Sequence, residues 1–319
     1  MSTFLFIKRV DIISDIIKYS IIVPTFNRVE RLRGLIDSLK KQTIPKSEYE
    51  IIIVNDGSTD STPLLLEKEA STCKHILLEN NGPAYARNRG AKEAKGSILV
   101  FTDDDVIVPV DWLERIGEIL FDAGIDAIGG SVKNCIDSTI AAAYNDMLLY
   151  LLEKYNQDKV YFLLTNNFAC RKIVFNTLGG FDERLTIGSE DREFVTRLTT
   201  SKYQVEYVPG LKIEHYHNFT LWSFCKHHFR FGRASHLFYT VINADNIYDL
   251  KPDTFSNYIK LFSYTFKRVN DYSRYIRISI TILSQVFFLS GFLFSSIAGT
   301  KNLRANRQGF KITRKIEQD

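Results

Sequence analysis

The alternation of strand-like and helix-like stretches between residues 20 and 130 is the feature that most limits how this 319-residue chain can fold. Short apolar runs at Ser20–Val23, Glu50–Val54 and Ser97–Thr102 predict buried strands. Glu30–Lys41 and Ala84–Lys95, which lie between them, have the composition and spacing of helices. Strands that alternate with helices predict an α/β fold, a mostly parallel sheet with helices on both faces.

Polar and acidic residues follow three of the predicted strands. Pro24 and Thr25 come after the first, Asp56 after the second, and the run Asp103, Asp104 and Asp105 after the last. Ligands of such sheets bind at the carboxyl ends of the strands. Three adjacent carboxylates repel one another, and a hard divalent cation shared with substrate phosphates would supply the counter-charge. A solvated acidic turn or helix cap is the alternative explanation of the aspartate run.

Composition and absent motifs narrow the class of protein. The apolar content of 45% and the charged content of 24% are ordinary for a globular protein. The four cysteines are scattered and form no CxxC pair, which favours free thiols in a reducing, cytosolic compartment. No GxGxxG follows a strand, and no GxxxxGK[ST] is present. Dinucleotide-dependent oxidoreductase and P-loop functions therefore have no support.

A 23-residue stretch without charge, residues 278–300, lies between Arg277 and Lys301. It is long enough to span a bilayer, which needs about 20 apolar residues. Several serines dilute it, and basic residues on both sides give the positive-inside rule no orientation to choose. Two interpretations stay open: a membrane-embedded or interfacial helix, and a helix packed against the preceding domain.

Six short motifs occur in a fixed order along the chain. They are Ile22–Asn27 (IVPTFN), Val54–Asp60 (VNDGSTD), Gly82–Gly90 (GPAYARNRG), Phe101–Asp105 (FTDDD), Gly179–Glu183 (GGFDE) and Ser189–Asp191 (SED). Together they resemble the family 2 glycosyltransferases of GT-A fold, over about residues 19–235. The resemblance implies a GT-A-type mostly parallel twisted sheet flanked by helices, with a helical C-terminal extension.

The resemblance assigns the nucleotide-sugar site by position. It implies that Pro24, Thr25 and Asp56 line the nucleobase pocket, that Arg87 lies near the nucleotide, that Asp103 faces the ribose, and that Asp104 fills the variable position of the DxD element. A buried carboxylate such as Asp56 can accept hydrogen bonds from a base edge and so select it. By itself, Asp56 is better explained as a turn carboxylate that caps a helix at Ser58.

The resemblance also assigns the metal site and the catalytic base. Asp105, with Asp103, would bind Mn²⁺ or Mg²⁺ that bridges the diphosphate, and His215 would be a further ligand. Asp191 would take the proton of the acceptor hydroxyl, with Glu190 as the near alternative. Acidic residues at a helix start are favoured by the macrodipole, and a strand histidine can simply be packed, so both assignments have a structural alternative.

The expected protein is an enzyme that transfers one sugar from a nucleotide-diphosphate sugar, UDP- or dTDP-linked, to a hydroxyl of a glycan or lipid-linked acceptor. The transfer should invert the configuration at the anomeric carbon and serve cell-surface polysaccharide or glycoconjugate synthesis. No nucleic acid is expected as a partner. A nucleotidyltransferase and a non-catalytic sugar-nucleotide binding protein are the alternatives. We expect an N-terminal extension at 1–18, a catalytic domain at 19–235 with nucleotide-binding (19–110) and acceptor (111–235) halves, and a helical region at 236–319. The site of action should be cytoplasmic, at the inner face of the membrane, with surface contact through 278–300.

Overall fold

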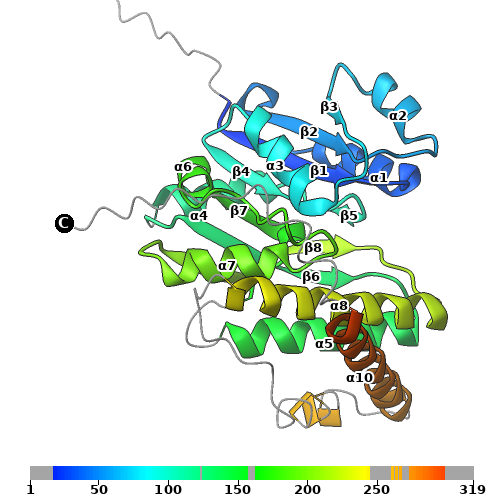
Figure 1. Cartoon of the computed structure of the whole chain (residues 1–319). Helices are drawn as coiled ribbons and strands as arrows, with labels where there is room; N and C mark the ends of the chain where they lie inside the picture. Colours follow the sequence, from blue (N-terminus) through cyan, green and yellow to red (C-terminus); the bar gives the residue numbers. More distant parts are fainter. Residues whose placement is uncertain are drawn as a thin grey trace, which may run out of the picture.

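The computed structural model describes residues 17–122, 124–156, 162–244, 260–261, 263–264, 266–267 and 273–298. One eight-stranded sheet, in the order β3-β2-β1-β4-β7-β6-β8-β5, runs through the molecule (Figure 1). The four strands of the N-terminal half are β1 (Tyr19–Thr25), β2 (Tyr49–Asn55), β3 (Lys74–Leu77) and β4 (Ile98–Phe101). All four are parallel, as the alternating pattern predicts.

The helices of this half cover both faces of the sheet. They are α1 (Val29–Leu39), α2 (Thr62–Lys68) and α3 (Pro83–Glu93), with a 3-10 turn η1 at Lys46–Glu48. Successive strand side chains point to opposite faces, so Ile21 and Val23 pack with α1 whereas Ile22 packs with α3. Both cores are fully buried around the same strand. The carboxyl end of β1 is therefore held rigidly, and the site residues follow it.

The second half adds antiparallel strands to the sheet. Its elements are β5 (Val106–Ile107), α4 (Trp112–Asp122), β6 (Ala127–Asn134), α5 (Thr139–Tyr155), η2 (Thr165–Asn167), β7 (Phe168–Arg171), α6 (Lys172–Thr177), α7 (Glu190–Thr200) and β8 (Val205–His215). β7 lies antiparallel to both β4 and β6, while β8 is parallel to β6 and antiparallel to β5. The mostly parallel sheet that the sequence predicts is confirmed, with these antiparallel additions.

Two expected strand boundaries are wrong in this half. The sequence pattern of residues 160–169 predicts a strand. In the structure residues 162–164 are irregular and β7 begins only at Phe168; residues 160 and 161 lie outside the described residues. The sequence pattern also predicts two separate strands, at residues 205–208 and 212–217. The structure has one strand, β8, because the register slips between Gly130 and Ser131 of β6 and the extra residues bulge out.

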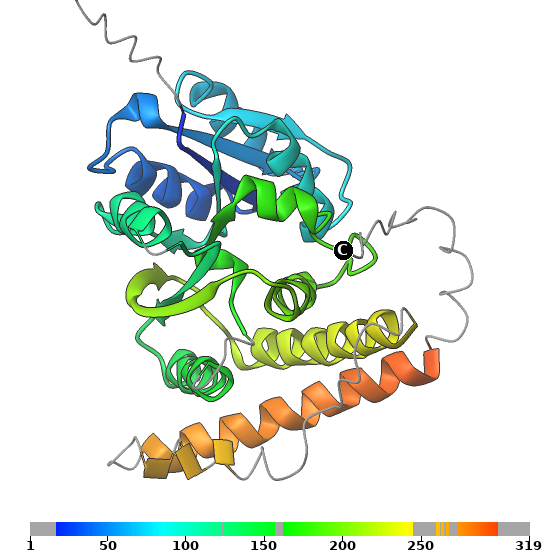
Figure 2. The same cartoon turned by 90° about the vertical axis from the view of Figure 1, so that its left-hand side faces the viewer.

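Two long helices, α8 (Leu221–Ala244) and α10 (Ser273–Ala298), run side by side on the far side of the second half (Figure 2). Their backbones meet at a glycine pair: a Cβ on Gly232 would lie 1.9 Å from the Phe288 carbonyl oxygen, and one on Gly291 would lie 2.0 Å from that of Phe229. α10 also pairs with α5, through Arg277 and Asp146 at 3.1 Å. Within the described part of the chain, α10 is the helix that is long and apolar enough to cross a membrane.

Candidate active site

The aspartate run leaves the carboxyl end of β4 and turns back toward the end of β1. The Thr25 hydroxyl donates to Asp104 Oδ2 at 2.7 Å, and Arg28 Nη1 donates to Asp104 Oδ1 at 3.0 Å. Burial raises the pKa of Asp104 to about 6, against the opposing pull of Arg28. Asp104, expected at the variable position of the motif, is therefore the buried anchor that joins the ends of two strands.

Asp105 lies at the centre of a set of three metal-ligating side chains. His215 Nε2 is 3.1 Å from Asp105 Oδ1, and His217 Nδ1 is 3.8 Å from Oδ2. One ligand atom from each of the three residues lies within 4.8 Å of the others. Burial alone would raise the pKa of Asp105, but His215, Arg28 and His217 together outweigh burial and hold this pKa well below its usual range.

This set fits a divalent cation. Burial lowers the pKa of His217 to about 4, despite the nearby Asp105 carboxylate, so its imidazole is neutral at pH 7 and can offer a lone pair. The buried Nδ1 of His215 has no hydrogen-bond partner. Two imidazoles with one carboxylate suit Mn²⁺ better than Mg²⁺, which prefers oxygen ligands. Asp103 is outside this set, so its part in metal binding stays a prediction.

Arg87 joins the aspartate run to the acidic pair at the start of α7. Its Nη1 donates to Glu190 Oε1 at 2.5 Å, and its Nη2 donates to Asp103 Oδ1 at 2.6 Å. Arg87 and Glu190 are both buried. The Arg87 guanidinium of α3 thus brings together Asp103, in the β4–β5 loop, and Glu190, in α7.

Asp191 stands beside this bridge at the first turn of α7. Its Oδ1 accepts from the backbone N–H of Arg192 at 2.7 Å. Burial first and the adjacent Glu190 second raise the pKa of Asp191 to about 7. A carboxylate with a pKa near neutrality, beside the Arg87 bridge to Asp103, has the chemistry of a general base.

Asp56 holds the loop that leads into α3. Its two oxygens accept from the backbone N–H groups of Asn81 and Gly82, both at 2.8 Å. Gly82 has a φ of +92°, and a Cβ there would lie 2.9 Å from the Thr186 carbonyl oxygen. Asp56 therefore fixes the loop that leads into α3, the helix that carries Arg87. The carboxylate keeps further lone pairs, and its contact with a nucleobase stays a prediction.

The GGFDE motif packs against α3 and does not enter the acid cluster. Asn88 Nδ2 donates to the Phe181 carbonyl oxygen at 2.8 Å, and Asn88 Oδ1 accepts from the Phe181 N–H at 2.9 Å. Gly180 has a φ of +73°, and a Cβ there would lie 2.7 Å from Asn88 Oδ1. The motif thus fixes the chain that leads to Glu190.

Four residues near the site are absent from the predicted set. Arg28 and Arg31 pair with Asp105, and His217 completes the metal-ligating set. The fourth is Tyr144 of α5: burial raises its pKa most, and the nearby charges of Asp105, Asp103 and Asp191 raise it further. His217 could have been found from its position two residues after His215. Tyr144 gave no sequence signal, because only tertiary packing brings α5 to the site.

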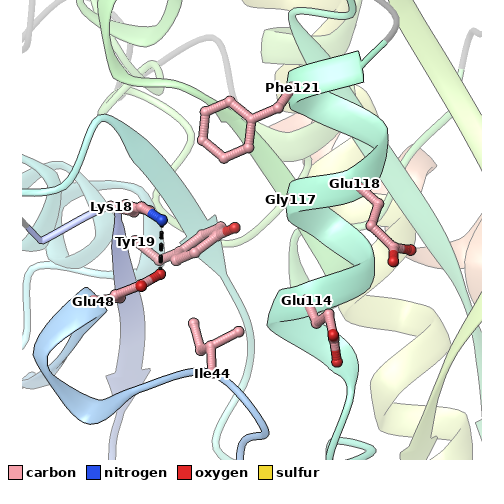
Figure 3. Close-up of a pocket in the computed structure, with 8 residues that line it drawn as sticks. All are labelled: Lys18, Tyr19, Ile44, Glu48, Glu114, Gly117, Glu118 and Phe121. Atoms are coloured by element: carbon pink, nitrogen blue, oxygen red, sulfur yellow. Dashed lines mark ion pairs between the residues drawn. The ribbon is translucent and has the colours of Figure 1, made fainter.

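A hollow of about 480 Å³ lies at the opposite end of the sheet (Figure 3). Tyr19, at the start of β1, lines it together with Glu114 and Phe121 of α4. The Lys18–Glu48 ion pair, at 2.9 Å, crosses one side of the hollow. The candidate site follows the carboxyl ends of β1 and β4, so this hollow is separate from it.

The fold is that of the GT-A glycosyltransferases. The mannosyltransferase PcManGT from Pyrobaculum calidifontis, solved with GDP-Man and Mn²⁺, superposes with a TM-score of 0.58 at 18% identity, covering 91% of this chain and 88% of that one. TarS 1–349 of S. aureus, solved with UDP, gives a TM-score of 0.53 at 18% identity, covering 89% and 92%. The fold predicted from the sequence is confirmed.

The sequence model of Glycosyl transferase family 2 matches residues 20–179, and the chain belongs to this family. Glycosyltransferase AglE of Haloferax volcanii is 28% identical over 193 residues, which are 59% of this chain and 63% of AglE. Poly(ribitol-phosphate) beta-N-acetylglucosaminyltransferase TarS of Staphylococcus aureus is 40% identical over 101 residues, 30% of this chain and 18% of TarS. Membership of this family supports the predicted glycosyltransferase activity, and the chain spans less than two thirds of the length of either curated relative.

Replacing Arg87 with Met should destabilise the fold by about 3–5 kcal/mol, because it leaves the buried Glu190 carboxylate without its partner. The double variant Arg87→Met/Glu190→Gln should recover much of that loss, since it removes the unpaired charge. Urea unfolding of both variants measures the two free energies. If the single and double variants were equally destabilised, the unpaired Glu190 carboxylate would not be the cause of the lost stability.

Proposed function

We propose that the protein is an inverting, metal-dependent glycosyltransferase that moves one sugar from a nucleoside-diphosphate sugar to an acceptor hydroxyl. The observation that carries this proposal is the Arg87 bridge, which joins the aspartate run to the Glu190–Asp191 pair. A cation-binding carboxylate and a proton-accepting carboxylate in one cluster are what a single displacement requires. The absence of the QxxRW element of processive synthases favours one transfer per encounter.

Asp191 is the proposed base. The acceptor oxygen attacks the anomeric carbon as the bond from that carbon to the diphosphate oxygen breaks on the opposite face. The acceptor proton passes to the Asp191 carboxylate, and the nucleoside diphosphate leaves with the electron pair of the broken bond. Arg87 holds Glu190 at 2.5 Å, which fixes the first turn of α7 and hence the direction of Asp191.

Asp105, His215 and His217 are the proposed ligands of Mn²⁺ or Mg²⁺, with Mn²⁺ favoured by the two imidazoles. When bound, the cation would act as a Lewis acid toward the diphosphate leaving group. The structure of PcManGT holds Mn²⁺ together with a nucleotide sugar, which supports this proposal. Asp103 remains a candidate for the ribose or for a further cation contact.

The proposed donor is a UDP- or dTDP-sugar, bound over Pro24, Thr25 and Asp56 at the carboxyl ends of β1 and β2. TarS structures contain UDP or UDP-GlcNAc, which supports a uridine nucleotide, whereas PcManGT contains GDP-Man. The hydrogen bonds that Asp56 accepts from Asn81 and Gly82 would set the depth of this pocket. The proposed acceptor is a glycan or lipid-linked hydroxyl in polysaccharide or glycoconjugate synthesis.

The proposed place of action is the cytoplasmic face of the membrane, with α10 as the contact. One face of α10 packs on α8 through Gly291, while a row of large apolar side chains faces outward. The exposed ones are Tyr275, Ile276, Ile282, Val286, Leu289, Leu293, Phe294 and Ile297. A helix fixed lengthwise on the protein, with an apolar outer face, suits binding in the plane of a lipid surface.

The Asp191→Asn variant should lose transfer activity by about a thousandfold while keeping its donor affinity, because only proton acceptance is removed. In the wild type, activity should rise with pH through about 7, since Asp191 accepts a proton only when it is ionised and its pKa is raised to about 7. The donor is first selected by a thermal-shift screen of nucleotide sugars. Glu118→Gln, on the distant α4, should keep the wild-type pH profile. Asp191→Asn with full activity would remove Asp191 from the mechanism.

Asp105→Ala should weaken Mn²⁺ binding by about a hundredfold and abolish Mn²⁺-dependent turnover, because it removes the carboxylate of the ligand set. The measurement is the free Mn²⁺ signal in electron paramagnetic resonance, titrated against protein. His75→Ala, on the exposed strand β3, is the matched control and should bind Mn²⁺ as the wild type does. Undiminished Mn²⁺ affinity in Asp105→Ala would refute the proposed ligand set.

The triple variant Val286→Ser/Leu289→Ser/Leu293→Ser should no longer float with anionic phosphatidylglycerol vesicles, whereas the wild type should. The reason is that the substitutions remove outward apolar surface without touching the face of α10 that packs on α8. Leu64→Ser/Leu77→Ser/Ile173→Ser, at exposed apolar positions elsewhere, is the matched control. A wild type that stays in the soluble fraction would exclude the proposed contact.

A further inference from the structure

Two arginines at the start of α1 lie over the aspartate run. Arg28 Nη1 is 3.0 Å from Asp104 Oδ1 and 3.1 Å from Asp105 Oδ2, and Arg31 Nη1 is 3.3 Å from the same Asp105 oxygen. The arginine side chains are 41% and 35% exposed, whereas those of Asp104 and Asp105 are 3% and 2% exposed. Buried carboxylates are thus covered by cations that reach the solvent.

Two kinds of positive group can bind Asp105 Oδ2: the arginine guanidiniums and a metal ion. The two guanidiniums contact it, and it also belongs to the carboxylate that, with His215 and His217, forms the candidate metal set. A divalent cation held by this carboxylate would lie close to two positive groups, and like charges at such a distance repel. Arg28 and a metal ion therefore compete for Asp105.

Arg28 differs from Arg87 in what it can still bind. Arg87 is buried, and its Nη2 and Nη1 already bind Asp103 and Glu190, so these nitrogens are not available to a ligand. Arg28 makes both of its ion pairs through Nη1, and among the described residues its Nε and Nη2 have no partner. A planar guanidinium with unused donors at the solvent edge suits the non-bridging oxygens of a diphosphate.

We propose that Arg28 and Arg31 neutralise Asp104 and Asp105 until a divalent cation takes Asp105, and then bind the diphosphate of the nucleotide-sugar donor. This inference rests on the proposed function, because it needs a donor with a diphosphate. It makes the two ligands cooperative: the cation alone must displace a guanidinium, whereas the diphosphate gives that guanidinium a new partner. The cation therefore binds the protein–donor complex more tightly than it binds the free protein. The donor likewise binds the protein–cation complex more tightly than it binds the free protein.

The first measurement is a calorimetric titration with Mn²⁺ alone. Arg28→Gln should bind Mn²⁺ about tenfold more tightly than the wild type, because a competing positive charge is gone. Arg31→Gln should show the same sign with a smaller change, since its single contact is longer. Arg33→Gln is the matched control on the same helix. Arg33 is exposed, and its one ion pair within the described part of the chain is with Glu30 at 3.8 Å, so the variant should leave Mn²⁺ affinity unchanged.

The second measurement is the affinity for UDP, GDP, ADP, CDP and dTDP, each titrated in excess Mn²⁺. The nucleotide that the wild type binds best should bind about tenfold more weakly to Arg28→Gln, and Arg28→Lys should restore part of the loss. The two affinities thus change in opposite directions. A variant that is merely misfolded would weaken both, so this pattern separates the proposed role from a structural one.

Unchanged or weaker Mn²⁺ binding in Arg28→Gln would overturn the competition, and unchanged nucleotide binding would overturn the contact with the diphosphate. The Mn²⁺ arm uses no nucleotide and stands independently of the proposed function. A wild type that binds none of the five diphosphates would instead overturn the proposed function, and with it the donor half of this inference.

Discussion

The buried guanidinium of Arg87 is the constraint on which the arrangement of the site depends. It satisfies Asp103 with one arm and Glu190 with the other, across 103 residues of sequence in the second case. The Arg87 and Glu190 side chains are both buried, whereas that of Asp103 is 32% exposed. Burial of either the Arg87 or the Glu190 charge alone would be costly, so these two must be buried together. The position of α7, and with it the direction of Asp191, follows from that requirement.

Further contacts join the other motifs to one another in the same way. Thr25 binds Asp104, Asp56 binds the N–H groups that open α3, and Asn27 accepts from the N–H groups of Thr59 and Asp60. Each contact links the end of one strand to a loop that follows another. The motifs of this chain therefore form a single hydrogen-bonded edge of the sheet, in which each motif depends on contacts with another.

Carboxylates in this edge differ in protonation because their surroundings differ. Asp105 is held ionised by His215 and the arginines, which suits a cation ligand, whereas burial and Glu190 leave Asp191 able to hold a proton near neutral pH. Environments that separate the pKa values of neighbouring acids are a recurrent basis for assigning their roles.

The sequence by itself determined the alternating α/β pattern, the parallel N-terminal strands and the positions of Asp103 to Asp105 and Glu190–Asp191, because periodicity and local motifs specify elements and their ends. It missed the continuous strand β8, since the register slip that absorbs Pro209-Gly210 occurs in pairing with β6. Only the tertiary structure decided that Arg28 covers Asp105, that Tyr144 lies near the acids and that Asp56 holds the loop before α3. Those contacts join residues far apart in the chain, and no local pattern records which distant charge will share a buried site.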